Sequence, residues 1–304
     1  METLLQVAVE GLGLGLIYAV LALSLWLLWD VARVVNLAHG DLAVVGAYTA
    51  WWVQSRYDAE PLAAVLVVVP AAAVLGPALH RLIFAPLLTR PPIASVLATF
   101  ALSLGLQAAL RAATSAMPVT ARDTTAGTWS IGPVELTAAH GVVALLGGLL
   151  AAACVAALRR TWTGKSLRAV AGNRSAAHLL GVDVPRMVRL TVVAAIAVAL
   201  TAGVLLAQLQ WVQPMTGTAV TVKVLAVAAV SGLRRVRTVI AAAIAVGCTE
   251  VAVTSLAPGA GSRVVLLLSA AVVVVGLLVR PLRAAQDHPP ATAAPAPQPA
   301  EERW

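Results

Sequence analysis

Long apolar runs, separated by short polar segments, recur along almost the whole chain. Runs of about 17 or more apolar residues are typical of helices that cross a membrane. The runs lack the period-two alternation of membrane-barrel strands, and helices and closed barrels are the structures that satisfy the backbone in lipid. We therefore predict an all-α, polytopic helical membrane protein with about eight or nine transmembrane helices.

The candidate spans can be placed by residue number. They cover residues 4–29, 34–53, 62–82, 93–110, 139–158, 190–209, 218–233, 236–256 and 264–279. The stretch 218–233 is short, which leaves open that one segment is re-entrant. The first run is long enough to span and no basic residue precedes it, so we expect a retained helix rather than a cleaved signal peptide.

The basic residues predict the orientation. If the loop 159–189 is cytoplasmic, the loops on its side hold most of the arginines, among them Arg33, Arg81 and Arg90. Loops on the cytoplasmic side carry the excess of Lys and Arg in membrane proteins. The expected topology therefore has the N-terminus outside and the C-terminus inside.

Composition supports a membrane protein and argues against other classes. The chain is 60% hydrophobic and 11% charged, whereas soluble domains carry about 25% charged residues. The net charge of +8 follows from the basic loops, so it does not indicate nucleic acid. Cys154 and Cys248 lie in apolar runs without a CxxC or Cys/His partner, and we expect neither a metal site nor a cofactor.

Two segments outside the spans have their own character. Residues 112–138 form an outer loop whose "TWSIGPVELT" indicates a small hairpin or lid. The tail 284–304 is rich in Pro and Ala, has no apolar periodicity, and is expected to be a disordered cytoplasmic tail. The membrane domain would then be residues 1–283.

The loop "RRTWTGKSLRAVAGNRSAAHLLGVDVPRMVRL" is the most informative polar stretch. Its Gly-Lys-Ser, residues 164–166, is not a phosphate-binding loop, because Arg159 stands where the first glycine is needed and no strand precedes it. Asn173 and Asp183 can cap two short helices, and Gly181 can end the first in a left-handed conformation.

Two readings of this loop remain open. In one it is only a basic inner loop. In the other, a helix pair too short to hold its own core docks a cytoplasmic subunit, with Ala176 and Ala177 as a smooth surface for close packing.

Two ionisable residues lie inside spans, where charges are costly and are by default functional. Lys223 and Glu250 each lie a few residues from the outer end of adjacent spans, which at about 1.5 Å per residue is a similar depth. We predict an ion pair. It serves either helix register or transport, and the sequence does not favour one over the other.

A third polar group stands in "VVNLAHGDLAVVGAYTAWW", residues 34–52. Asn36, His39 and Gly40 are spaced to share one face of a helix, and Asp41 follows. We expect a packing and gating face near the cytoplasmic interface. His39 and Asp41 point to different faces, which disfavours an intramembrane enzyme.

Two stretches together resemble a known family. "NLAHGDLAVVGAY" is similar to the Asn-Phe-Ala-His-Gly-Glu segment of branched-chain amino acid ABC transporter permeases of the LivH type, and "GKSLRAVAGNRSAAHLLGVDVPRMVRL" resembles their coupling loop. The likeness covers roughly residues 5–280. It implies a non-enzymatic importer subunit in a bacterial cytoplasmic (inner) membrane, without a cofactor. Its partners would be a second permease, two cytoplasmic ATP-binding subunits and an extracytoplasmic solute-binding protein.

The resemblance also assigns residues. The family's Glu-Ala-Ala-x-x-x-Gly pattern falls at Ser175, Ala176, Ala177 and Gly181, so the acidic position is lost here. Leu37 and Asp41 replace the family's Phe and Glu. The implied coupling loop also includes Gly164, Lys165 and Arg168.

The expected function is therefore an ATP-driven importer subunit for branched-chain amino acids or related amides or urea. The alternative is a stand-alone secondary transporter or channel for a small polar solute, which would need no ATPase subunits.

Overall fold

The computed structural model describes residues 2–88, 90–121, 128–131, 134–231, 236–256 and 264–273. The predicted tail 284–304 lies outside the described residues. The elements in chain order are α1 (Glu2–Leu27), the π-helical η1 (Leu28–Ala32), α2 (His39–Tyr57), the 3-10 helix η2 (Pro61–Ala64), α3 (Val65–Leu79), the π-helical η3 (His80–Phe84), α4 (Ala85–Leu87), α5 (Pro92–Thr114), β1 (Thr128–Ile131), β2 (Val134–Thr137), α6 (Ala138–Arg160), α7 (Trp162–Gly172), α8 (Arg174–Leu179), α9 (Val184–Leu209), α10 (Thr216–Ser231) and α11 (Val236–Leu256). A further apolar helix covers Val264–Val273.

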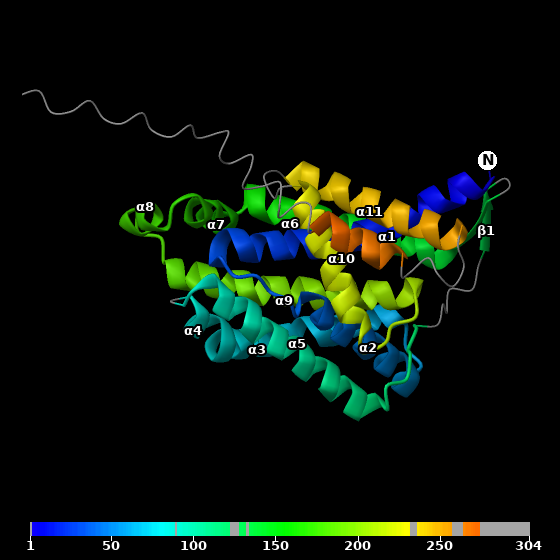
Figure 1. Ribbon diagram of the computed structural model, residues 1–304, viewed down its shortest axis with the longest axis horizontal. Helices are drawn as coiled ribbons and strands as arrows, with labels where there is room; N and C mark the ends of the chain where they lie inside the picture. The colour runs from blue at the N-terminus through cyan, green and yellow to red at the C-terminus, as the bar shows by residue number, and fades with distance from the viewer. Residues whose placement is uncertain are drawn as a thin grey trace, which may run out of the picture.

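The long helices run along one direction, and the two ends of the bundle differ (Figure 1). The short helices α7 and α8 project from one end, and the N-terminus and the hairpin strand β1 lie at the other. The predicted hairpin is confirmed: β1 and β2 pair antiparallel, with Thr128 opposite Thr137. We call these the α8 end and the hairpin end.

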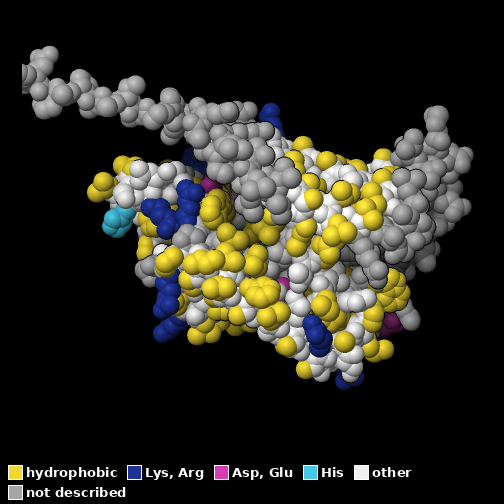
Figure 2. Space-filling model, viewed as in Figure 1, with side chains coloured by type: hydrophobic (Ala, Val, Ile, Leu, Met, Phe, Trp, Pro, Cys, Tyr) yellow, Lys and Arg dark blue, Asp and Glu magenta, His cyan; other side chains and the backbone are white. Residues whose placement is uncertain are grey.

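The predicted class, a helical membrane protein, is confirmed. Six helices within the described residues are long and apolar enough to cross a membrane, and every predicted span contains a helix. Apolar side chains cover the visible flank of the bundle, and Lys and Arg gather near the α8 end (Figure 2). How many helices cross, and in which direction, stay predictions.

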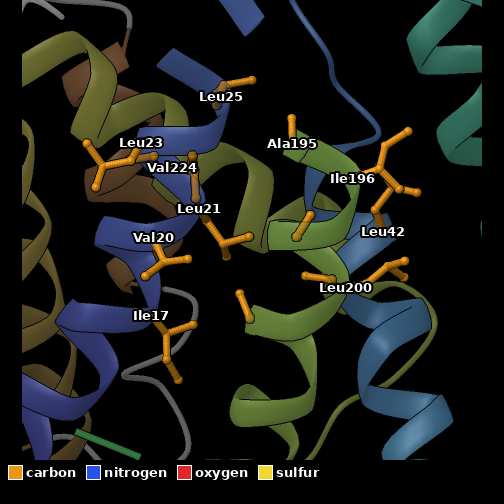
Figure 3. Packing of buried hydrophobic residues seen from close by; sticks show 14 of the residues in the cluster. Ile17, Val20, Leu21, Leu23, Leu25, Leu42, Ala195, Ile196, Leu200 and Val224 are labelled. Carbon is orange, nitrogen blue, oxygen red and sulfur yellow. The ribbon is translucent and has the colours of Figure 1, made fainter. Parts of the chain in front are cut away.

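Two helices form the centre of the bundle. The most apolar window of α1 is 78% buried and that of α9 is 67% buried, against 22% for α5 and α6. Ile17 and Leu21 of α1 face α9, while Leu42 of α2 lies on the opposite side of α9 (Figure 3). In lipid such packing is driven by van der Waals contact rather than by exclusion of water. The closely packed α1 and α9 form the frame around which the polar groups lie.

Candidate functional site

The chain is not helical where it enters the polar stretch of residues 34–52. The predicted helix 34–53 begins instead at His39, and residues 33–38 form a break between η1 and α2. Arg33, with φ of 57°, ends η1 in the left-handed conformation. The prediction that Asn36 shares a helix face with His39 and Gly40 is therefore wrong. Asn36 lies before the helix, and its Oδ1 accepts from the Ala38 N–H at 3.1 Å.

Two threonines from distant helices satisfy the broken backbone. Thr99 Oγ1 of α5 accepts from the Leu37 N–H at 3.1 Å. Thr221 Oγ1 of α10 accepts from the Gly40 N–H at 2.9 Å and lies 3.1 Å from the Leu37 carbonyl oxygen. Non-helical backbone inside a membrane protein is tolerated where the surrounding protein supplies such partners.

His39 packs against α1. It is 1% exposed, and its Nε2 is 2.8 Å from Ser24 Oγ and 3.2 Å from the Leu21 carbonyl oxygen. Ser24 precedes the end of η1 at Ala32 by about 12 Å of helix, at ~1.5 Å per residue. Because His39 contacts Ser24 and Leu21, residues 33–38 run back along α1 before α2 starts. The expectation that Asn36 and His39 lie near the interface stays a prediction.

Asp41 is held by a second polar group. Gln107 Nε2 donates to Asp41 Oδ1 at 3.0 Å and lies 2.9 Å from Thr218 Oγ1 of α10. Asp41 is 0% exposed. Among the described residues, its Oδ2, the Nδ2 of Asn36 and the Nδ1 of His39 are buried without a hydrogen-bond partner. We call Asn36, His39 and Asp41 the break cluster.

Glycines bring the surrounding helices into backbone contact. A Cβ on Gly40 would collide with the Gly217 carbonyl oxygen, and one on Gly46 would collide with the Leu200 carbonyl oxygen. A Cβ on Gly203 would collide with the Ala43 carbonyl oxygen. Small residues at membrane helix crossings allow this approach, so α2 is fixed against both α9 and α10.

The predicted ion pair is confirmed. Lys223 Nζ of α10 lies 2.5 Å from Glu250 Oε1 of α11. The Tyr18 hydroxyl of α1 donates to Glu250 Oε2 at 2.8 Å and accepts from Lys223 Nζ at 3.2 Å. The three side chains therefore join α1, α10 and α11.

The capping predictions in the polar loop are confirmed. Asn173 Oδ1 accepts from the Ala176 N–H, and Asp183 Oδ1 accepts from the Arg186 N–H, each at 3.0 Å. Gly181 has φ of +81°.

The exposure of α8 differs from the prediction in one residue. Ser175 and Ala176 are exposed, but Ala177 is 2% exposed, so the prediction that Ala177 offers an outer surface is wrong. Leu179 and Leu180 form that surface instead, at 85% and 82% exposure.

The other loop residues have distinct positions. Gly164 lies against α6, where a Cβ would collide with the Ala157 carbonyl oxygen. Lys165 Nζ lies 4.8 Å from the centre of the Trp162 ring, and Arg168 is exposed.

Two arginines connect this loop to the break. Arg174 Nη2 at the start of α8 donates to the Val31 carbonyl oxygen of η1 at 2.5 Å, and Arg33 Nη2 donates to the Ala171 carbonyl oxygen of α7 at 3.2 Å. Burial and, to a lesser degree, the nearby Arg33 charge lower the pKa of Arg174. These two bonds tie α8 to η1 and α7 to Arg33.

The family profile described as "Branched-chain amino acid transport system / permease component" matches residues 7–279. The chain belongs to this family.

Curated relatives carry the same description in their names. High-affinity branched-chain amino acid transport system permease protein LivH of Salmonella typhimurium and that of Escherichia coli K12 are each 24% identical over 217 residues, which is 67% of this permease and 70% of theirs. Probable branched-chain amino acid transport permease protein LivH of Methanocaldococcus jannaschii is 27% identical over 245 residues, 77% of this chain and 76% of its own. A solved structure, PsaBC from Streptococcus pneumoniae in complex with Fab, has a TM-score of 0.49 at 13% identity over 88% of this chain and 90% of its own, a likeness too weak to support an argument.

One part of the permease site, a polar stripe on α5, was not predicted from the sequence. Ser95, Thr99, Ser103 and Gln107 form a polar stripe along α5, each no more than 3% exposed. Their constant spacing of four residues places them on one helix face, and that spacing in an apolar run was the available signal. The stripe supplies partners for the Leu37 N–H and for Asp41.

Proposed function

We propose that this permease is a membrane subunit of an ATP-driven importer for branched-chain amino acids in a bacterial cytoplasmic membrane. It works with a second permease, two cytoplasmic ATP-binding subunits and an extracytoplasmic solute-binding protein. The names of its relatives support the transport system and the substrate class. The observation that carries the proposal is the exposed surface of α8 and its bond to η1, which leads into the segment that carries the break cluster.

The α8 surface has the properties of a docking site. Leu179 and Leu180 are almost fully exposed next to Ser175 and Ala176. This apolar group sits on short capped helices at the end of the bundle where basic side chains gather (Figure 2). Exposed apolar side chains of this kind are typical of a protein–protein contact. We assign this surface to the docking of an ATP-binding subunit.

The arginine contacts supply the connection between docking and transport. Movement of α8 displaces Arg174, which is bonded to η1, and η1 leads directly into residues 33–38. Short π-helical segments are frequent at functional sites. We propose that ATP-driven movement of α8 shifts the break cluster between the arrangement seen here and one open to solute.

The break cluster has the chemistry that a zwitterion needs. Asn36 Nδ2 is a donor without a partner, and Asp41 Oδ2 is an acceptor without a partner. The start of α2 inside the bundle adds a partial positive charge. In the open arrangement these groups replace part of the hydration of the amino-acid head group as it passes.

Co-purification tests this proposal. The tagged permease is co-expressed with candidate ATP-binding subunits of its own organism, and we expect such subunits to be retained. The double variant Leu179→Asp/Leu180→Asp should release them. The matched control is Met215→Asp, which changes an exposed residue (62%) just before α10, and it should retain them.

Each part of the proposal can fail separately. A wild-type permease that retains no ATP-binding subunit and still transports solute would support the stand-alone transporter. Retention by the double variant would show that α8 is not the docking surface. Leucine uptake into proteoliposomes of the full complex, with binding protein and ATP, tests the substrate class.

A further inference from the structure

A groove of about 650 Å³ lies between the segment η3–α4 and the first half of α5. Its α5 wall runs from Ala94 to Leu102, which is ~12 Å of helix at a rise of about 1.5 Å per residue. The segment η3–α4 lies toward the α8 end of the bundle, and α5 leads away from that end (Figure 1). The groove is separate from the break cluster, which lines no part of it.

The wall of the groove is apolar apart from one residue. The apolar lining residues are Leu82, Ile83, Pro86, Leu87, Ala94, Leu97, Ala98, Ala101 and Leu102. Leu82 and Leu97 are 74% and 62% exposed, so the wall is open to the surroundings of the bundle, which in a membrane protein are acyl chains. An acyl chain gains van der Waals contact along such a wall, whereas a polar solute finds no hydrogen-bonding side chain on it.

The remaining lining residue, Arg90, supplies a positive charge at one end of the groove. It lies in the connection between α4 and α5. Its side chain is exposed, and within the part of the chain that the structure describes its guanidinium has no hydrogen-bond or ion-pair partner. The first turn of α5 follows without a side-chain cap, so its partial positive charge adds to that of Arg90.

The order of these groups matches one class of amphiphile. A guanidinium binds phosphate oxygens through two parallel N–H donors, and the apolar wall begins directly beside it. A phospholipid has its phosphate and its acyl chains in the same order. A free phosphate ion would use Arg90 alone, because the apolar wall adds nothing to its binding. Basic pockets between membrane helices on the cytoplasmic side bind anionic head groups, and Arg90 lies on that side in the predicted topology.

We propose that this groove binds one anionic phospholipid, with its phosphate on Arg90 and an acyl chain along the α5 wall. The proposal does not depend on the proposed importer function. The polar stripe of α5 lies on a different face of the same helix and bonds to Asp41. A bound lipid therefore packs on the helix that supports the break cluster, and it covers part of a helix whose most apolar window is only 22% buried.

Native mass spectrometry of the delipidated full chain tests the site. We expect one phosphatidylglycerol molecule to bind saturably, with about tenfold higher affinity than phosphatidylcholine of the same acyl chains, whose choline group cancels the phosphate charge. Arg90→Gln should remove this preference, because a hydrogen bond between charged groups is typically worth about tenfold or more in affinity. Ala101→Phe, which fills the groove from α5, should weaken the binding of both lipids.

The matched controls lie on the same helix. Arg111→Gln and Ala108→Phe change exposed residues that do not line the groove, and both should bind phosphatidylglycerol as the wild type does. Soluble glycerol 3-phosphate should not compete, which separates a lipid site from a site for free phosphate. Thermal unfolding of each variant identifies losses caused by misfolding, in which case Leu97→Trp replaces Ala101→Phe.

Four results overturn the proposal. They are equal affinity for the two lipids, competition by glycerol 3-phosphate, wild-type binding by both Arg90→Gln and a groove-filling variant, and displacement of the lipid when a second permease joins the complex. The last result would assign the groove to a contact between proteins. None of these measurements uses uptake, so a failure here leaves the proposed importer function in place.

Discussion

The two buried polar groups of this permease differ in how completely they are bonded. In the ion-pair group both Glu250 oxygens have partners, and Lys223 Nζ contacts both Glu250 and the Tyr18 hydroxyl. In the break cluster three buried polar atoms have none. A buried polar atom without a partner is costly. We infer that the ion pair holds three helices in place, whereas the break cluster keeps atoms free for partners that it gains in another arrangement.

The largest effect is expected from breaking the ion pair on one side. Glu250→Ala leaves Lys223 charged and buried, which typically costs about 3–5 kcal/mol in free energy of unfolding. Denaturant unfolding in mixed micelles measures the loss. The apolar double variant Lys223→Met/Glu250→Leu should recover most of it, because no buried charge remains. A double variant as unstable as Glu250→Ala would contradict a simple pairing role.

A smaller loss of stability is expected when the hydrogen bond from Gln107 to the break cluster is removed. Gln107→Leu removes the donor to Asp41 Oδ1, leaving the buried carboxyl group with fewer partners, which costs about 1–3 kcal/mol. The same unfolding assay applies. Leu104→Ala on the exposed face of α5, at 51% exposure, is the control. If Gln107→Leu were no worse than this control, Asp41 would not depend on α5.

Tyr18→Phe tests how far the ion pair depends on its third member. The variant removes the hydroxyl that bonds both charged groups but leaves the 2.5 Å contact between them. We expect a loss of about 1 kcal/mol, the usual net value of one hydrogen bond. A loss as large as that of Glu250→Ala would mean that the hydroxyl, rather than the opposite charge, supports Lys223.

The smallest stability change is expected for His39→Gln, together with a large change in transport. The Gln side chain has nearly the volume of the imidazole, so no cavity forms in this buried position. Ser24 also keeps its bond to the Leu21 carbonyl oxygen, so stability should fall by no more than about 1 kcal/mol. Uptake by the assembled complex should fall severalfold at normal membrane insertion. His80→Gln, in η3, is the control. Wild-type uptake in His39→Gln would remove His39 from the transport path.

The sequence predicts best what depends on regular or local geometry. The ion pair follows from counting residues along two helices, because the rise per residue is nearly constant. The caps at Asn173 and Asp183 depend on neighbours within three residues. The burial of Ala177 depends on the packing of α8 against the rest of the protein, and a six-residue helix gives no periodicity from which to predict it.

The break before α2 could not be predicted for a different reason. Residues 33–38 contain neither Pro nor Gly, and their composition also fits a helix. The decision is made by Thr99 and Thr221, whose hydroxyls bond to the backbone from positions 62 and 184 residues along the chain. Such contacts are visible only in the folded protein.

The order in which these partners appear matters during synthesis. Residues 33–41 enter the membrane long before α10, whose Thr221 lies 181 residues after Gly40. At about 5–20 residues per second, translation takes roughly 10–40 s to supply it. For that time the Gly40 N–H and the Leu37 carbonyl oxygen lack their final partner, and for the first part of it Asp41 also lacks Gln107, which lies 66 residues after it. The insertion machinery must therefore shelter this segment, or it waits at the water boundary until the later helices arrive.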